Sequence, residues 1–318
     1  MSNTDEPLDR IAPKPLFRDP IWDGAADPTI IHDYSTGEWV LVYTNRRANV
    51  PGLPGVSWVH GTHLGSARSS DGGITWTYRG IVNLPLGGLD DSHWAPEIVW
   101  DYGVYHMYLS FVPGVHEDWS GTREMHHLTS TDLVDWQHIS QIDLSSDRVI
   151  DACVHRLHDG SWRMWYNNEP DNKAIYYADS PDLYQWTDHG KATGDVPGEG
   201  PNVFFWHGYF WMVVDIWRGQ AVYRSLDAMT WERQPDVILA EPGVGEDDRV
   251  MGGHAKVQVC GDRAYLFYFT HPGRVPENAG QDQTETRRSS IQVVELHLEN
   301  GWITCDRNAP CQIRLATC

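Results

Sequence analysis

The sequence predicts an all-β protein, a five-bladed β-propeller of four-stranded antiparallel blades that forms one domain over residues 1–318. A two-part phrase recurs five times along the chain: a short apolar run, a turn, and a second run rich in aromatic and β-branched residues. A tryptophan follows in each of the first four units, and these tryptophans are 60, 50 and 45 residues apart, the size of one blade. Because blades bury their faces only against neighbours, five of them are expected to close into a ring.

The paired runs indicate β-hairpins, because Gly or Asp in each intervening turn can adopt the positive φ that tight turns need. The first runs, expected to be the inner strands, are 27–31, 95–99, 151–154, 200–204 and 254–257. The second runs are 38–43, 104–109, 162–166, 209–214 and 264–269. A third element with a turn and the marker tryptophan completes each unit. In the first unit, residues 69–76 match the Asp-box turn of propeller blades.

Shorter versions of this turn occur at 130–136, 180–186 and 225–231, whereas the fifth unit, at 289–303, is degenerate. The expected blades are therefore 20–85, 90–142, 148–192, 198–238 and 250–306, followed by a tail at 307–318. We expect a segment near residues 16–22 to pair with the last blade, because an open ring would leave strand edges free to aggregate.

Composition limits the partners of the protein. The formal net charge of −20 argues against nucleic acid and anionic membranes, whose binding needs clustered Lys and Arg. No stretch reaches the ~18–20 apolar residues of a membrane span. The five cysteines lack metal-ligand spacing. Their odd number and the absence of a signal-peptide pattern predict reduced thiols and a cytoplasmic location. The oligomeric state stays open.

Alignment of the five inner strands brings one position of each strand to the mouth of the central channel. That position is occupied by Asp27, Ala95, Asp151, Gly200 and His254, with Glu199 immediately before Gly200. Three carboxylates and a histidine should therefore meet there, although close carboxylates repel and burial costs each of them free energy. This favours a functional site. The alternative is that these residues only begin strands and face water, since Asp-Pro and Glu-Gly-Pro are also ordinary turn sequences.

The blade openings resemble those of glycoside hydrolase family 43 and its relatives, in order and with blade-sized gaps: 26–28, 94–97, 150–152, 199–201 and 253–254. The resemblance covers nearly the whole chain. It implies that Asp27 is the general base, that Asp151 modulates the pKa of its neighbours, and that Glu199 is the general acid. It also implies that His254 lies beside a calcium ion, a sodium ion or a water in the axial channel, with no cofactor required. Ala152 departs from the family pattern, which often has proline after the aspartate.

Paired carboxylates suit glycoside hydrolysis, which needs one acid to protonate the leaving oxygen and one base to activate water. We expect Asp27, Asp151 and Glu199 to lie within roughly 10 Å of one another. The charge of Asp151 should keep Glu199 protonated, while Asp27 stays ionised. A separation of about 6.5–9.5 Å between Asp27 and Glu199 would give inversion of configuration.

Substrate contacts are expected from the loops between the second and third strands of each blade. The candidates there are Arg46, Trp58, Trp119, Asn168, Trp217, Arg218 and His271. His93 and Trp94 precede the second inner strand and should reach the pocket directly, while Glu97 has either a charge-pairing or a ligand role. Long loops in the first two blades should wall the pocket, which favours a chain end as substrate.

The expected protein is an exo-acting, inverting glycoside hydrolase. Its expected substrate is a terminal furanose or pentose, such as arabinofuranose, galactofuranose or xylose, on an oligo- or polysaccharide. The sugar is implied by the resemblance alone, because a fold does not set a function. Two alternatives remain: another propeller carbohydrase, either a transglycosylase or a fructoside-acting enzyme, and a non-catalytic sugar-binding propeller.

Overall fold

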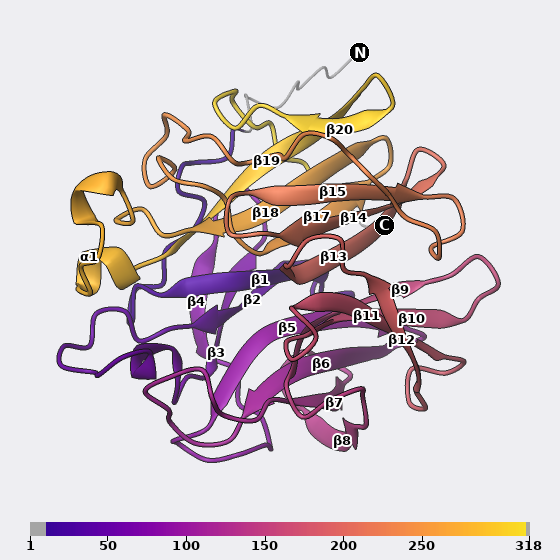
Figure 1. Ribbon diagram of the computed structural model, residues 1–318, viewed down its shortest axis with the longest axis horizontal. Helices are drawn as coiled ribbons and strands as arrows, with labels where there is room; N and C mark the ends of the chain where they lie inside the picture. Colours follow the sequence, from indigo (N-terminus) through magenta and orange to yellow (C-terminus); the bar gives the residue numbers. More distant parts are fainter. Residues whose placement is uncertain (1–10, 316–318) are drawn as a thin grey trace, which may run out of the picture.

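The computed structural model describes residues 11–315 and confirms the all-β, five-bladed propeller (Figure 1). Five sheets, each of four antiparallel strands in sequence order, surround a common centre. The first strands of adjacent sheets pack against each other around the whole ring. The chain therefore runs outward through each blade and then returns to the centre to begin the next.

The strands occupy equivalent places in the five blades. The innermost strands are β1 (Ala25–His32), β5 (Ser92–Asp101), β9 (Val149–Arg156), β13 (Glu199–Trp206) and β17 (Ala255–Cys260). The second strands are β2 (Trp39–Asn45), β6 (Val104–Val112), β10 (Trp162–Asn168), β14 (Tyr209–Asp215) and β18 (Arg263–Thr270). The third strands are β3 (Leu64–Ser69), β7 (Glu124–Ser130), β11 (Ala174–Ser180), β15 (Gln220–Ser225) and β19 (Ser290–Glu299). The outermost strands are β4 (Thr77–Ile81), β8 (Gln137–Ile142), β12 (Thr187–Thr193), β16 (Glu232–Arg233) and β20 (Trp302–Cys305).

Helix is scarce in the described part of the chain. It comprises α1 (Thr284–Arg287) and the 3-10 turns η1 (Ser57–Val59) and η2 (Pro276–Asn278). None of these is long and apolar enough to cross a bilayer.

The hydrophobic core is divided among the five seams between blades. Val40 of the first blade and Met107 of the second share one buried cluster, and each other seam has a similar cluster. The second strands β2 and β10 are buried along their whole length because neighbouring blades cover both of their faces. The outermost strand β4, in contrast, alternates between exposed and half-buried residues. The second strands, which are rich in tryptophan and tyrosine, thus supply much of the core between the blades.

The seam between the last and first blades closes the ring. Its cluster joins Tyr43 of β2 and Phe267 of β18 with Phe17 and Ile313, which lie before the first blade and after the last. Phe17 pairs with Ile291 of β19 through two backbone hydrogen bonds of 3.1 and 2.9 Å. The N-terminal segment thus pairs with the last blade as expected, although through isolated bridges at Phe17 and Gly24 rather than a full strand.

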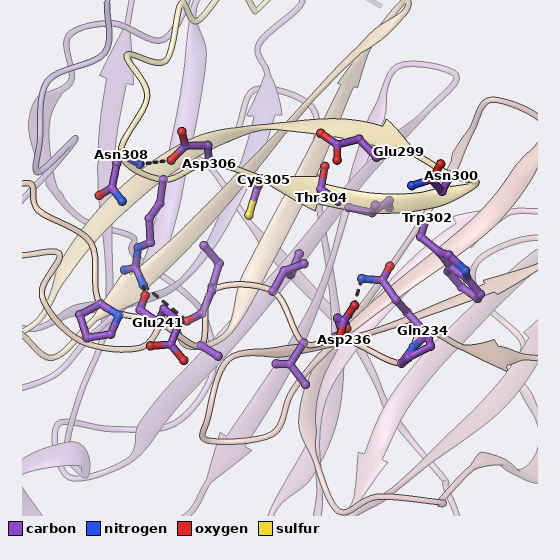
Figure 2. A pocket seen from close by; sticks show the side chains of 18 residues that line it. Gln234, Asp236, Glu241, Glu299, Asn300, Trp302, Thr304, Cys305, Asp306 and Asn308 are labelled. Atoms are coloured by element: carbon purple, nitrogen blue, oxygen red, sulfur yellow. Dashed lines mark hydrogen bonds between the residues drawn. The ribbon is translucent and has the colours of Figure 1, made fainter.

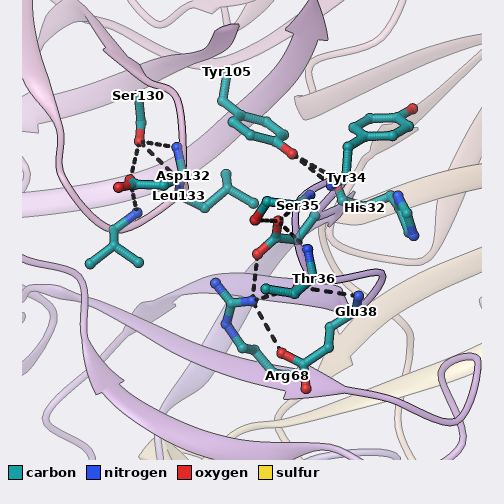
Figure 3. Close-up of polar contacts among 12 residues, drawn as sticks. His32, Tyr34, Ser35, Thr36, Glu38, Arg68, Tyr105, Ser130, Asp132 and Leu133 are labelled. Carbon is teal, nitrogen blue, oxygen red and sulfur yellow. Dashed lines mark hydrogen bonds and ion pairs between the residues drawn. The ribbon is translucent and has the colours of Figure 1, made fainter. Parts of the chain in front are cut away.

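The turn between β1 and β2 shows how a hairpin is fixed against its neighbours (Figure 3). The Asp33 carboxylate accepts a hydrogen bond of 2.6 Å from Arg68 of β3. Tyr105, from the second blade, donates its hydroxyl to the His32 carbonyl at 3.2 Å and accepts from the Tyr34 N–H at 2.9 Å. A side chain of the second blade therefore satisfies backbone groups in the turn of the first.

The Asp-box turns join the third and fourth strands. The Ser69 hydroxyl donates to Asp71 at 2.8 Å, and Ser130 donates to Asp132 at 2.9 Å in the second blade (Figure 3). The third and fourth blades repeat this contact at Ser180–Asp182 and Ser225–Asp227. Within residues 11–315, Cys153, Cys305 and Cys311 are free thiols, and Cys318 lies outside the described residues.

Candidate active site

Bulges at the start of four of the inner strands, β1, β5, β9 and β13, turn one residue of each toward the channel. The pairing register shifts beside each bulge. The residues with positive φ there are Asp27 (49°), Ala95 (43°), Asp151 (62°) and Gly200 (57°). This conformation is unfavourable for residues with a Cβ, so the surrounding structure must hold it. Bulges of this kind are known for re-aiming side chains. His254 occupies the fifth equivalent position, just before β17.

A buried cluster forms around His254. Its Nδ1 atom lies 3.7 Å from Asp27 Oδ1 and 3.9 Å from Asp151 Oδ2. Asp151 Oδ2 also accepts a hydrogen bond of 3.0 Å from the Gly200 N–H. Burial, followed by the charges of Glu199 and Asp27, raises the pKa of Asp151 well above its usual value. Burial lowers the pKa of His254 against the opposing charges of the same two acids. The uncharged forms of Asp151 and His254 are therefore favoured.

Asp27 is held by an arginine from the loop after β2. Arg46 Nη2 lies 3.1 and 3.0 Å from the two Asp27 oxygens, and Arg46 Nη1 lies 3.1 Å from His271 Nε2. Since an arginine can only donate, His271 Nε2 accepts, and His271 Nδ1 donates to the Arg288 carbonyl at 2.9 Å. Burial lowers the pKa of His271 well below its usual value, which favours the same neutral form. The Arg46 guanidinium also lies 4.9 Å from the centre of the Phe269 ring. These contacts fix the orientation of the Asp27 carboxylate.

Glu199 lies at the start of β13, on the opposite wall. Its Oε1 accepts a hydrogen bond of 3.0 Å from the Trp217 indole, and its Oε2 accepts one of 3.2 Å from Lys173 Nζ. Lys173 also donates to Glu169 at 2.9 Å, and Glu169 lies 2.7 Å from the Arg123 guanidinium. Although burial opposes it, Glu199 and Glu169 raise the pKa of Lys173, so the ammonium stays charged. The Glu199 side chain is 27 % exposed and remains accessible from the pocket.

A fourth carboxyl group adjoins Glu199. Asp215, the last residue of β14, pairs in register with Glu199 and accepts a hydrogen bond of 2.8 Å from the Trp217 N–H. Burial, followed by the charge of Glu199, raises the pKa of Asp215 to about 8. Asp215 was not predicted, because the alignment of inner strands does not include the second strands. The signal was nevertheless present, because Thr44, Ser110 and Asn167 are polar residues at equivalent second-strand positions.

The acids and His254 line one cavity of about 430 Å³, here called the catalytic pocket. Six expected substrate-binding residues also line it: Arg46, Trp58, Trp94, Trp119, Trp217 and His271. Trp119 and Trp217 are 53 % and 43 % exposed, and both can offer a ring face to a sugar. The pocket also holds the charged residues Arg123, Glu169, Lys173, Asp215 and Arg274. Most of them lie in the loops between the second and third strands. The charged residues in these loops do not recur at equivalent positions from blade to blade.

Four expected contact residues lie outside this pocket. His93 is buried behind it and contacts the Leu86 carbonyl at 3.1 Å, because neighbours in a strand point to opposite faces. Asn168 Oδ1 accepts a hydrogen bond of 2.8 Å from Ser146. Arg218 is exposed and follows Trp217 on the outer side of its loop. The fourth, Glu97, lies deeper in the channel and has the charge-pairing role.

One residue from each inner strand forms a polar ring below the acids. Its members are Thr29, Glu97, Cys153, Asn202 and Lys256, each two residues beyond the aligned channel position. Lys256 Nζ donates to the two Glu97 oxygens at 2.8 and 2.7 Å. Glu97 also accepts from the Val154 N–H at 3.1 Å, and Asn202 accepts from the Val257 N–H at 2.8 Å. The ring thus ties neighbouring blades together.

The composition of this polar ring decides whether the expected metal ion could bind in the axial channel. Calcium and sodium prefer several oxygen ligands, but the Glu97 carboxylate in this ring is already bound to the Lys256 ammonium. Within residues 11–315, no group of three or more His, Cys, Asp and Glu side chains is arranged to hold a metal ion. His254 itself contacts the Asp27 and Asp151 carboxyl groups. The residues present therefore do not fit a calcium site.

A separate groove of about 580 Å³ lies at the edge of the ring between the fourth and fifth blades (Figure 2). It is lined by the segment around Gln234 and Glu241 and by β20 with its flanking residues, including Trp302 and Asp306. None of the acids of the catalytic pocket lines this groove. Its volume alone therefore does not make it the functional site.

Comparison with known proteins places the fold. No protein-family model matches the sequence, and no curated protein is significantly similar to it. Among solved structures, a thermostable family-43 glycoside hydrolase gives a TM-score of 0.67 at 15 % identity, covering 94 % of this chain and 99 % of that one. The chain has the five-bladed fold of the family-43 glycoside hydrolases.

Two further structures share this fold. An exo-1,5-α-L-arabinanase from a bovine ruminal metagenomic library gives a TM-score of 0.59 at 16 % identity, covering 91 % of this chain and 99 % of that one. The Bombyx mori family-32 β-fructofuranosidase gives 0.66 at 15 % identity, covering 93 % and 66 %. At such identities the likeness concerns the fold alone.

Proposed function

We propose that this protein is an exo-acting, inverting glycoside hydrolase. The observation that carries the proposal is the convergence of Asp27, Asp151 and Glu199, from three different blades, on one walled pocket. Glycoside hydrolysis requires two carboxyl groups across the scissile bond, one that protonates the leaving oxygen and one that activates water. Gathering acids at the centre of a ring has a desolvation cost that a purely structural role does not explain.

Asp27 is the proposed general base. The two hydrogen bonds from Arg46 orient its carboxylate, and the neutral His271 accepts a hydrogen bond from the other terminal nitrogen of Arg46. An oriented carboxylate can accept the proton of an attacking water as that water adds to the anomeric carbon.

Glu199 is the proposed general acid, and the Trp217 indole orients its carboxyl group. The ammonium of Lys173 lies 3.2 Å from Glu199 Oε2, and the neighbouring carboxyl groups of Asp151 and Asp215 favour their protonated forms. These carboxyl groups form one coupled titrating system, from which a proton can reach Glu199. Asp151 is the proposed modulator of that system, because its side chain lies between the base and the acid blades. The expected proton on Glu199 stays a prediction.

The proposed substrate is a chain end with a terminal furanose or pentose, such as arabinofuranose, galactofuranose or xylose. Loops from all five blades surround the catalytic pocket, which suits one terminal residue better than an open cleft would. The similar structures include an exo-arabinanase and a β-xylosidase. The likeness to a β-fructofuranosidase favours a fructoside as the second candidate.

A panel of nitrophenyl glycosides of arabinofuranose, galactofuranose, xylose and fructose tests the proposal. One member should be hydrolysed, and NMR of the first-formed sugar should give the inverted anomer. Glu199→Gln should retain binding of the matching free sugar while losing hydrolysis of an oligosaccharide. Sugar binding by the wild type without any hydrolysis would instead identify a non-catalytic propeller.

A further inference from the structure

A second cavity of about 610 Å³ adjoins the catalytic pocket, and we call it the outer cavity. Residues 275–287 of the loop between β18 and β19 form most of its wall, and the loops after β2 and β6 form the rest. Trp58, Trp119 and Arg274 line both cavities, so the two are continuous. A substrate end that fills the catalytic pocket would extend past these three side chains.

Arg274 differs from the other cationic side chains along this path. Four of the five are in salt bridges within the described chain: Arg46 with Asp27, Arg123 with Glu169, Lys173 with Glu169 and Glu199, and Arg287 with Asp282. Arg274 makes no salt bridge to any residue between 11 and 315. Its guanidinium is therefore not ion-paired, in a protein of net charge −20; the nearby carboxylate of Asp282 is paired with Arg287 instead.

The Arg274 guanidinium is nevertheless fixed in direction. Its Nε donates to the Thr286 carbonyl at 3.1 Å, whereas its two terminal nitrogens have no hydrogen bond to a described residue. The residue is exposed at the junction of the two cavities. A guanidinium held in this way presents two parallel N–H donors, the geometry that matches a carboxylate or a sulfate.

Trp119 provides an apolar face beside this charge. It is 53 % exposed, and buried Arg123 holds its carbonyl at 3.0 Å. Trp58 is buried, with the Arg287 guanidinium 5.7 Å from its ring centre. An exposed indole next to a free guanidinium forms a combined surface for a sugar ring that carries an acidic group.

We propose that the outer cavity binds an acidic sugar in the leaving part of the substrate, with Arg274 holding its carboxylate or sulfate group and Trp119 stacking on its ring. This assignment rests on the proposed glycosidase function, because it places the leaving part next to Glu199. It adds a substrate class: glycans in which the terminal neutral sugar is attached to a uronic acid or a sulfated sugar.

Binding of small acidic sugars by ligand-observed NMR tests the assignment without requiring turnover. The probes are methyl glucuronoside, its uncharged methyl ester, and methyl glucoside 6-sulfate. An acidic probe should bind the wild type about tenfold more tightly than the ester, as one charge-assisted hydrogen-bonded pair would give. The acidic probe that binds identifies the group as carboxylate or sulfate. The preference should weaken with added salt.

Arg274→Gln should remove this preference. The control is Arg79→Gln, which makes the same charge change at an exposed position on β4, remote from both cavities, and should keep the preference. Equal affinities for the acidic and ester probes, or a preference that survives Arg274→Gln, would overturn the assignment. If the preference is present but no glycoside is hydrolysed, the binding site stands and the proposed function fails.

Discussion

Asp215 is a buried carboxyl group beside Glu199 that the sequence did not predict. It is 2 % exposed and has a pKa of about 8 because of burial and the charge of Glu199. In the unfolded chain an aspartate titrates near pH ~4. The folded protein therefore holds a proton between about pH 4 and 8 that the unfolded chain releases.

Asp215→Asn should change how stability depends on pH. Below about pH 4 both states of the wild type are protonated at this site, so the charge has no cost. As the pH rises from there to about 8, the wild type loses stability relative to the variant, by the order of a few kcal/mol. Melting temperatures at pH 5, 7 and 9 measure the difference. The exposed Asp262→Asn is the control and should run parallel to the wild type; a parallel Asp215→Asn curve would contradict the assignment.

At the scale of elements, the bulges of the inner strands position the residues of the site. Gly200 has a φ of +57°, and a Cβ added there would lie 2.6 Å from His254 Cγ. A side chain at this position would therefore push His254 away from Asp27 and Asp151. The hairpin glycine Gly208, in the same blade, has a φ of +83° but no atom within 4 Å of an added Cβ. Substitution of both glycines therefore introduces backbone strain, but only substitution of Gly200 also displaces His254.

Gly200→Ala should therefore reduce both stability and activity, whereas Gly208→Ala should cost only backbone strain of about 1 kcal/mol. We expect kcat/KM on an activated glycoside to fall at least about tenfold for Gly200→Ala and to stay near the wild-type value for Gly208→Ala. Thermal melts and initial rates of both variants are the measurement. Equal effects would mean that His254 does not depend on this bulge.

The blade elements were predictable because each is encoded locally, by an apolar run, a turn and a marker tryptophan. Alignment of those runs then brought Asp27, Asp151, Glu199 and His254 together, because the ring places equivalent positions side by side. The bulges were not predictable, since register shifts depend on pairing rather than on composition. The ion pairs of Lys173 were not predicted either, because its partners Glu169, in the same loop, and Glu199, on the next blade, follow no repeating pattern. His93 was misplaced because strict alternation turns it away from its neighbour Trp94.

At the scale of the whole molecule, the polar ring on the axis joins the blades through the Lys256–Glu97 pair. Glu97 is 3 % exposed, so its carboxylate would be buried without a partner if Lys256 were removed. Lys256→Met should destabilise the protein by about 3–5 kcal/mol. Adding Glu97→Gln to that variant should recover a large part of the loss, because the unpaired charge is then removed. A single variant as stable as the wild type in chemical denaturation would contradict this role.

The same pair leads to a prediction about metals. Because an ammonium already neutralises Glu97, treatment with a chelator should leave the melting temperature and the hydrolysis rate of the wild type unchanged, and added calcium should raise neither. A fall of several degrees after chelation, reversed by calcium, would establish a metal site that the side chains do not suggest.

The central claim is that Glu199 protonates the leaving group while Asp27 activates water. The most direct test compares kcat/KM of Glu199→Gln and Asp27→Asn on the hydrolysed nitrophenyl glycoside and on a disaccharide of the same sugar. A nitrophenolate leaves with little protonation, so Glu199→Gln should lose about 100-fold more on the disaccharide than on the aryl glycoside. Asp27→Asn should lose a similar large factor on both, because water must attack in either case. Equal losses for Glu199→Gln on the two substrates would contradict the account.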